Sequence, residues 1–270
     1  MHFLKMQACG NDFVIIDHVA GIPHGFAISA ALAIQVCDRH FGVGCDQLLW
    51  LKPSRDFSAL VEIFNADGSV AEMCGNGMRA IGVYLAKSGP APGLADYAVR
   101  TEAGSASRTV AIDLRGEFPE VALGRPTVSR LDEKIAPYGA FSRVDIGNPH
   151  AVFFVSSAEA LTAIDLEHDG PAIETHSLFP NRTNVEFVAV LDRRRVSVRV
   201  WERGAGATLA CGSGACAVVV AAEARGLVDA GERIEVVLQG GSVFVRLVAG
   251  EALLSGPVGE VFEGEWRALR

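Results

Sequence analysis

One short pattern occurs twice in this sequence, and the repetition constrains the fold more than any other feature. The pattern Cys-Gly-x-Gly-x-x-Ala begins at Cys74 and again at Cys211, and we call the separation between these two positions the repeat offset. In each copy an apolar run with helical character follows the glycines, which predicts a cysteine at the N-terminus of a helix. The N–H groups at such a terminus, with the positive end of the helix dipole, attract an anion and favour thiolate over thiol.

The repeat offset relates four further pairs of segments. They are Gly10-Asn11 with Gly147-Asn148, Gln47 with Asn184, Phe64-Asn65 with Trp201-Glu202, and Gly89 with Gly226. With the cysteines, this makes five matches at one ungapped offset, which indicates two structurally equivalent halves that arose by duplication. The seam between the halves is expected near Leu123-Gly124-Arg125-Pro126.

Each half is expected to run as strands, one helix and more strands. The helices are expected over residues 76–87 and 213–225; both are apolar on nearly all sides, which is typical of a buried helix surrounded by strands. Further helices are expected over 27–39 and 158–164, and residues 129–141 have little periodicity and are expected to form a connection. Strands are expected at 13–17, 48–51, 60–64, 97–101, 109–114, 152–155, 185–190, 195–201, 233–237, 242–247 and 252–255.

Composition excludes several classes of function. The net charge is −8 and the sequence contains no Lys/Arg run, so we expect neither nucleic acid nor an anionic membrane as a partner. The six cysteines form no Cys-x-x-Cys pair, which disfavours zinc, and they are too few for a disulfide scaffold in a chain of 270 residues. Without an apolar run of about 18 residues or a signal-peptide core, a cytoplasmic protein is expected.

Two equivalent halves facing each other across a cleft would bring Cys74 and Cys211 to opposite sides of one ligand. Two helix N-termini would then point at one anionic group, most simply a carboxylate. Inversion of a stereocentre beside a carboxylate needs one base on each face, one starting as thiolate and the other as thiol. The helix N–H donors would stabilise the charge of the carbanion. Because no metal, P-loop or dinucleotide motif is present, we expect chemistry without metal or cofactor.

Each of these residues also has a purely structural interpretation. A cysteine alone is more often a small core hydrophobe, and we keep that interpretation for the four cysteines outside the repeat positions. Asparagines are ordinarily turn residues, but their place in the repeat favours the cleft. Glu202 and Arg203 interrupt an apolar approach to Cys211, nine and eight residues before it, and His150 is the histidine within a repeated segment.

Eight segments spread over nearly the whole chain resemble the diaminopimelate epimerase family. They are Lys5-Met6 with Gly10-Asn11-Asp12-Phe13; Arg39-His40-Phe41-Gly42-Val43-Gly44 with Asp46-Gln47; Phe64-Asn65-Ala66-Asp67-Gly68-Ser69; Cys74-Gly75-Asn76-Gly77; Gly147-Asn148-Pro149-His150; Asn184-Val185-Glu186-Phe187; Trp201-Glu202-Arg203-Gly204; and Cys211-Gly212-Ser213-Gly214-Ala215-Cys216-Ala217. The resemblance implies an α/β (α+β) fold of two pseudo-symmetric halves, each a β-barrel-like sheet around a central helix, with the active site in the cleft between them. It also implies that the last strand returns to the first half, which gives domains of 1–122 plus 257–270 and of 123–256.

The resemblance further implies a reaction and a set of roles. The reaction interconverts LL- and meso-diaminopimelate without pyridoxal phosphate, for lysine and peptidoglycan synthesis, in a protein that is commonly a homodimer. Cys74 and Cys211 would be the acid/base pair, with His150 and Glu202 setting their protonation states. The N–H groups of Gly75, Asn76, Gly212 and Ser213 would hold the reacting carboxylate. The distal amino-acid end would be read by Asn65, Asn148, Asn184 and Arg203, with Asn11 and Gln47 also lining the site.

Two segments depart from the usual pattern of the family. Ala207 stands where the family usually has Glu in Gly-x-Gly-Glu-Thr, and Gln7-Ala8-Cys9 stands in place of His-Gly-x. Two other functions were weighed against the epimerase. A racemase of the same fold acting on another amino acid would not need Arg203 together with Asn65 and Asn184. A non-catalytic binding protein for an amino acid would need a cleft but not two thiols.

Overall fold

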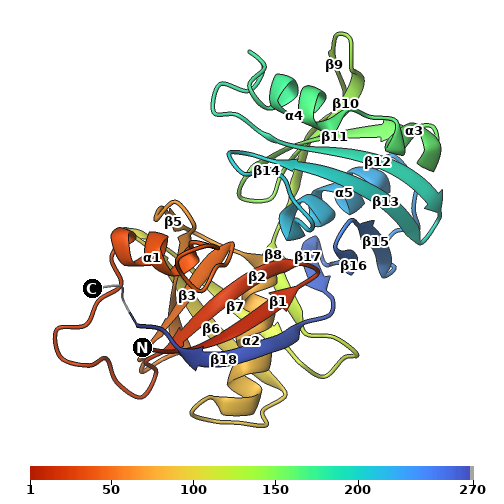
Figure 1. Ribbon diagram of the computed structural model, residues 1–270. Coiled ribbons are helices and arrows are strands. Elements are labelled where there is room, and N and C mark those ends of the chain that lie inside the picture. The colour runs from red at the N-terminus through yellow and green to blue at the C-terminus, as the bar shows by residue number, and fades with distance from the viewer. Residues whose placement is uncertain (268–270) are drawn as a thin grey trace. The chain divides into compact units, whose positions relative to one another are not determined.

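The computed structural model describes residues 1–267, which fold into two units (Figure 1). Unit 1 comprises residues 1–121 and 257–270, of which the last three lie outside the described residues; unit 2 comprises residues 122–256. Each unit is a sheet with a helix packed against it, as the predicted α/β fold of two equivalent halves requires, and that prediction is confirmed. Within residues 1–267, every helix is too short or too polar to cross a membrane.

Unit 1 is built on a row of hydrogen-bonded strands that mixes parallel and antiparallel pairs. The order is β18–β1–β2–β3–β4–β6–β7–β8, with parallel pairs at β2–β3 and β4–β6. Strand β18 therefore returns to the first half, beside β1. The elements are β1 (His2–Ala8), β2 (Asn11–Asp17), α1 (Ala30–Cys37), β3 (Gln47–Lys52), β4 (Ala59–Asn65), β5 (Val70–Ala71), α2 (Gly75–Ser88), β6 (Asp96–Ala103), β7 (Ala106–Asp113), β8 (Glu120–Gly124), which leads into unit 2, and β18 (Gly259–Glu265).

Unit 2 repeats this arrangement with its own segments. The order is β9–β10–β11–β12–β13–β15–β16–β17, again with two parallel pairs, β11–β12 and β13–β15. The elements are β9 (Thr127–Ile135), β10 (Gly139–Asp145), β11 (Pro149–Val155), α3 (Ala158–Thr162), α4 (Leu166–Glu174), β12 (Asn184–Asp192), β13 (Arg195–Glu202), β14 (Gly206–Ala207), α5 (Gly212–Ala224), β15 (Ile234–Leu238), β16 (Gly241–Val248) and β17 (Glu251–Ser255).

The equivalence of the two units extends to the register of their parallel strand pairs. Phe13 pairs with Gln47 in unit 1, and the residues one repeat offset later, His150 and Asn184, pair in unit 2. The second parallel pair behaves alike, with Ala59 opposite Val99 and Val196 opposite Val236. A one-residue slip would turn every side chain to the other face of the sheet. The matching registers therefore place repeat-equivalent residues in equivalent environments.

Helices α2 and α5 are the central helices of their units. Helix α5 contacts strands toward both ends of the row, from β9 to β12 and from β15 to β17. Every residue from Gly214 to Ala222 is buried. Helix α2 contacts β1, β2, β6 and β7, and it buries Met78, Ile81 and Leu85. Burial on all sides explains why the sequence pattern of these helices shows little polar face.

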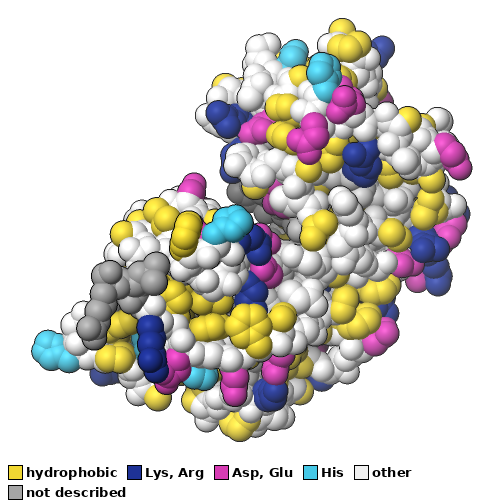
Figure 2. All heavy atoms as spheres, in the orientation of Figure 1, with side chains coloured by type: hydrophobic (Ala, Val, Ile, Leu, Met, Phe, Trp, Pro, Cys, Tyr) yellow, Lys and Arg dark blue, Asp and Glu magenta, His cyan; other side chains and the backbone are white. Residues whose placement is uncertain are grey.

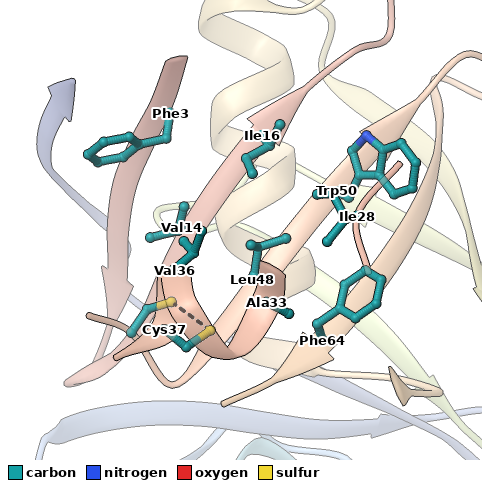
Figure 3. Packing of buried hydrophobic residues seen from close by; sticks show 11 residues of the cluster. Phe3, Val14, Ile16, Ile28, Ala33, Val36, Cys37, Leu48, Trp50 and Phe64 are labelled. Carbon is teal, nitrogen blue, oxygen red and sulfur yellow. Dashed lines mark hydrogen bonds between the residues drawn. The ribbon is translucent and has the colours of Figure 1, made fainter. Parts of the chain in front are cut away.

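A second layer in unit 1 packs α1 against β3 and β4, and side chains of β2 complete the same apolar cluster (Figure 3). Helix α1 begins after Ser29, whose Oγ accepts a hydrogen bond from Leu32 N at 3.2 Å, and not at residue 27 as expected. Cys37 and Cys45 lie in this core with their sulfur atoms 3.4 Å apart. On the outside, Figure 2 shows acidic, basic and apolar side chains interspersed over the face that it draws.

One expected connection is in fact two strands. Residues 129–141 were expected to lack secondary structure, but most of them belong to β9 and to the beginning of β10, which pair antiparallel. Most side chains of β9 are exposed or half-buried, so polar residues occur on both of its faces. The sequence of β9 therefore lacks the alternation of apolar and polar residues that would have predicted a strand. The sequence also did not predict strand β1 or helix α4.

Burial of the central helix predicts a large loss of stability when its side chains are shortened. Ile81→Ala in α2 removes a fully buried side chain and should lower the free energy of unfolding by about 2–5 kcal/mol. Ile34→Ala in α1, where the side chain is 45% exposed, is the matched control and should change it by less than about 1 kcal/mol. Urea unfolding of both variants measures the difference, and equal effects would contradict the central placement of α2.

Candidate active site

Both repeated cysteines cap the N-terminus of a central helix. Cys74 is the N-cap of α2, and its sulfur accepts a hydrogen bond from Gly77 N at 3.3 Å. Cys211 is the N-cap of α5, and its sulfur accepts from Gly214 N at 3.4 Å. The predicted position of the thiols at helix N-termini is confirmed. Backbone donors aimed at sulfur, with the helix dipole, stabilise negative charge on it.

In unit 1, amide side chains gather around Cys74. Asn11 Oδ1 lies 3.9 Å from Cys74 Sγ and accepts a hydrogen bond from Asn76 Nδ2 at 3.3 Å. Asn11 Nδ2 in turn donates to Asp46 Oδ2 at 2.8 Å, which fixes the orientation of the amide. The structure thus brings three of the predicted residues, Asn11, Cys74 and Asn76, together at the start of α2.

Gln47 and Asn65 form a second group in unit 1. They lie opposite each other on β3 and β4, and Gln47 Nε2 donates to Asn65 Oδ1 at 2.9 Å. Asn65 Nδ2 also donates to Ser69 Oγ at 3.0 Å in the turn that leads to β5. Both side chains are half-buried, so they can present polar atoms to a ligand as well as to each other.

Asp12 ties the segment that carries Asn11 to the loop after α1. Its carboxylate accepts hydrogen bonds from Lys5 and Arg39, and its backbone N–H donates to Asp46. Burial acts to raise the pKa of Asp12, but the hydrogen bonds from Arg39 and Lys5 outweigh it and hold the pKa at about 2. Asp12 therefore stays charged at neutral pH, and its contacts with Lys5, Arg39 and Asp46 hold the segment of Asn11 in place.

In unit 2, a chain of hydrogen bonds ends at Cys211. Asn148 Nδ2 donates to Ser213 Oγ at 3.4 Å, and Ser213 Oγ lies 3.5 Å from Cys211 Sγ. Asn148 Oδ1 lies 3.0 Å from His150 Nε2, on a ring that is fully buried. Asn148 and Ser213 occupy the positions that Asn11 and Asn76 hold in unit 1, which brings four predicted residues of unit 2 together.

The remaining predicted residues of unit 2 lie at the end of β13 and on β12. Asn184 Oδ1 accepts from Arg203 N at 2.9 Å, and Asn184 Nδ2 donates to Pro149 O at 2.9 Å. The guanidinium of Arg203 is in an exposed side chain, where it donates to Asn181 O at 3.4 Å. Asn184 is thus held by the protein on both sides of its amide, whereas Arg203 reaches outward.

Glu202 and Cys211 share one electrostatic environment. Burial raises the pKa of the Cys211 thiol well above its ordinary value, and the carboxylates of Glu202 and Glu186 raise it further. Burial also raises the pKa of Glu202, against hydrogen bonds from Thr208, at 2.5 Å, and from Cys211. Cys211 is therefore a thiol at neutral pH.

Sequence reasoning missed two buried charged residues that contact predicted site residues. Glu186 on β12 is fully buried with Oε1 2.7 Å from His150 Nδ1, and Arg79 on α2 is fully buried and donates to Asn76 Oδ1 at 2.6 Å. The repeat offset pairs Glu186 with Leu49 and Arg79 with Cys216, so each charge has an uncharged counterpart in the other half. That mismatch, within otherwise apolar segments, is the signal that could have identified both.

Comparison with known proteins places this geometry in a family. The sequence profile described as diaminopimelate epimerase matches residues 3–128 and 142–258. The diaminopimelate epimerase of Carboxydothermus hydrogenoformans is 44% identical over 98% of this chain and 99% of its own length. That of Acidiphilium cryptum is 39% identical over 97% of this chain and 95% of its own length.

Solved structures with low sequence identity share the fold. A phenazine biosynthesis protein of the PhzF family from Bacillus anthracis gives a TM-score of 0.75 at 13% identity, covering 99% of both chains. A hydroxyproline epimerase from Agrobacterium vitis, with bound trans-4-hydroxy-L-proline, gives a TM-score of 0.67 at 15% identity and covers 98% of this chain and 91% of its own. At these identities the likeness concerns the fold alone.

The third helical residue after each thiol provides a matched test of the two environments. A Cβ on Gly214 would lie 2.8 Å from Glu186 Oε1 and 3.3 Å from Cys211 Sγ, whereas a Cβ on Gly77 would meet Leu49 at 3.4 Å, an ordinary contact. Gly214→Ala should therefore lower the free energy of unfolding by about 1–3 kcal/mol. Gly77→Ala should change it by less than about 1 kcal/mol, because Ala also favours a helix over Gly.

Chemical denaturation of the two alanine variants provides the measurement. A Gly214→Ala variant as stable as the Gly77→Ala variant would show that the carboxylate of Glu186 does not pack against the start of α5.

Proposed function

The chain belongs to the diaminopimelate epimerase family, and from that premise we propose how its residues interconvert LL- and meso-2,6-diaminopimelate. The enzyme is an isomerase of amino-acid biosynthesis, and its product serves lysine and peptidoglycan precursor synthesis. The observation that carries the assignment of residues is the pair of repeat-equivalent thiols, Cys74 and Cys211, each capping a central helix.

The two thiols are proposed as the two bases. Inversion at the α-carbon requires one sulfur to remove the proton from one face and the other to return a proton to the opposite face. Cys211 is a thiol at neutral pH and so is suited to give its proton while Cys74 acts as the thiolate base. After one inversion the charges are exchanged, and the reverse reaction then begins from Cys211.

The helix N-termini are proposed to bind the carboxylate beside the reacting carbon. In the first turn of an α-helix the N–H groups have no carbonyl partner within the helix, which makes this end an anion site. Gly75 and Asn76 open α2, and Gly212 and Ser213 open α5. Their N–H groups would also stabilise the charge that spreads into the carboxylate as the proton leaves.

The distal amino-acid end of the substrate is proposed to be read by polar groups of both units. An exposed guanidinium can hold a carboxylate through two parallel hydrogen bonds, and Arg203 supplies it. The side-chain amides of Asn65, Asn148, Asn11 and Gln47 would accept and donate to the remaining polar atoms. Asn184 would act by holding the backbone of Arg203.

His150 and Glu202 are proposed to set the protonation of the second thiol. The carboxylate of Glu202 opposes a negative charge on the sulfur of Cys211 and so helps to keep the proton there. His150 is linked to the Cys211 thiol indirectly: the side-chain amide of Asn148 contacts both His150 and Ser213, which lies beside the thiol. Neither residue has a charged counterpart at the same place in unit 1, where the repeat has Phe13 and Asn65.

A racemase of the same fold would keep the two thiols but not the distal set. We favour diaminopimelate because its second charged amino-acid head requires recognition, and Arg203 with the amides of Asn65 and Asn148 could provide it. A binding protein without activity would have no use for two thiols in equivalent capping positions. We further propose that the enzyme works in the cytoplasm as a homodimer, for which the family resemblance is the support and analytical ultracentrifugation is the test.

Proton NMR with isotopically normal LL-diaminopimelate in D₂O tests the substrate. Loss of the α-proton signal together with appearance of the meso isomer is the expected result. If this substrate shows no exchange but another L-amino acid from a panel does, the two-thiol mechanism would still be supported, and the substrate would be that other amino acid. No exchange across the whole panel would favour the binding protein.

The two-base assignment predicts that neither thiol can be spared. Cys74→Ala and Cys211→Ala should each reduce epimerisation by at least about 10³-fold, because proton transfer from one side cannot invert the centre. Cys37→Ala, which removes a buried thiol of the α1 core, is the matched control and should retain activity. Circular dichroism checks the folding of all three, and substantial epimerisation by either active-site variant would refute the assignment.

A further inference from the structure

Glu186 is a buried charge without an assigned role. Its side chain is fully buried on β12, and among residues 1–267 its Oε2 has no hydrogen-bond partner. Its Oε1 lies 2.7 Å from His150 Nδ1. A buried carboxylate with one unpaired oxygen still costs stability, and an apolar residue of similar volume is usually tolerated better. The other half of this chain has that alternative, because the repeat-equivalent residue on β3 is Leu49, also fully buried.

Glu186 lies against the start of α5, beside Cys211. Gly214 lies next to both the carboxylate of Glu186 and the sulfur of Cys211. A Cβ built on this glycine would be 2.8 Å from Glu186 Oε1 and 3.3 Å from Cys211 Sγ. In unit 1 the equivalent Gly77 has the apolar Leu49 at the same place. The carboxylate therefore faces the thiol of one half at a position where the thiol of the other half has only methyl groups.

The opposite charge occurs in unit 1. Arg79 is fully buried on α2, and its guanidinium donates to Asn76, whose amide contacts Asn11 beside Cys74. At the equivalent position of α5 the repeat has Cys216. The two capping thiols thus share their backbone environment, but the fully buried charged side chain of unit 1 is a cation that reaches Asn76, and that of unit 2 is a carboxylate beside Cys211.

We propose that Glu186 is a positioning residue that holds Cys211 as a thiol in the resting enzyme, so that Cys74 is the thiolate of the pair. This inference rests on the proposed function, because it assigns starting states to its two bases. The groups that face Cys211 are Glu186 from β12, Glu202 from β13, Ser213 and the Gly214 N–H from α5, and His150 from β11 through Asn148. Two of these, Glu186 and Glu202, are carboxylates that oppose a second negative charge.

Alkylation of the substrate-free wild-type protein tests the starting states. Samples are treated with iodoacetamide between pH 5 and pH 11, and mass spectrometry of the peptides gives the rate at each cysteine. Because Cys211 is 4% exposed, its rates are slow, and only the midpoint of the pH profile is compared. The midpoint for Cys74 should lie at least one pH unit below that for Cys211. A midpoint for Cys211 at or below that for Cys74 overturns the proposal.

Glu186→Gln tests the residue itself. Glutamine keeps the shape and an oxygen that accepts from His150 Nδ1, but it removes the charge. The midpoint for Cys211 should fall by about one pH unit, so that its alkylation below the midpoint becomes about tenfold faster, while the midpoint for Cys74 stays unchanged. Loss of the fold alone would not move one midpoint selectively. An unchanged midpoint for Cys211 in the folded variant overturns the role of Glu186.

Glu223→Gln is the control. It removes a carboxylate from α5, the helix that Cys211 caps, at a position about 18 Å from Cys211 along the helix axis. It should leave both midpoints unchanged, and a shift equal to that of Glu186→Gln would show a general charge effect and overturn the specific one. If Glu186→Gln does not fold, Glu186→Leu, which supplies the residue that unit 1 has at Leu49, is measured in its place with the same expected and opposing outcomes. These measurements use no substrate, so a failure of diaminopimelate to react would reject the proposed function without affecting their outcome.

Discussion

The capping of a buried helix by a thiol is the interaction on which both halves of this protein depend. A helix that is apolar on nearly all sides has to be enclosed, and each sheet does this around α2 or α5. Enclosure leaves the N-terminus as the place where backbone donors can meet a ligand, and a cysteine at the N-cap puts its sulfur among them. The fold thereby combines a nucleophilic atom and an anion site in one short segment.

Duplication gave two such segments, and divergence made them chemically different. The parallel strand pairs keep the same register in both units, so the backbone around Cys74 and Cys211 is equivalent. The buried side chains are not equivalent, because one unit retains Arg79 and the other Glu186. For a reaction that inverts a stereocentre this difference is useful: two identical bases would start in the same protonation state, whereas the reaction needs one of each.

Much of this arrangement was readable from the sequence, because a repeat at constant offset is independent of local propensity. The repeat offset located both central helices, their capping thiols and the amides beside them. It could not locate β9, whose exposed faces carry no apolar alternation, and it gave no contacts for Glu186, whose importance appears only when Gly214 and His150 are seen beside it. Asn184 shows the same limit, since its hydrogen bonds to Pro149 and Arg203 arise from strand pairing.

Isotope incorporation during the first few per cent of reaction tests the two-base mechanism most directly. The enzyme is mixed with LL-diaminopimelate in D₂O, and mass spectrometry compares deuterium at the α-carbon of the meso product with that of the remaining substrate. Two thiols on opposite faces predict a deuterated product while the recovered substrate still carries protium. A product that retains the substrate's proton, or substrate and product that gain deuterium equally fast, would contradict the account.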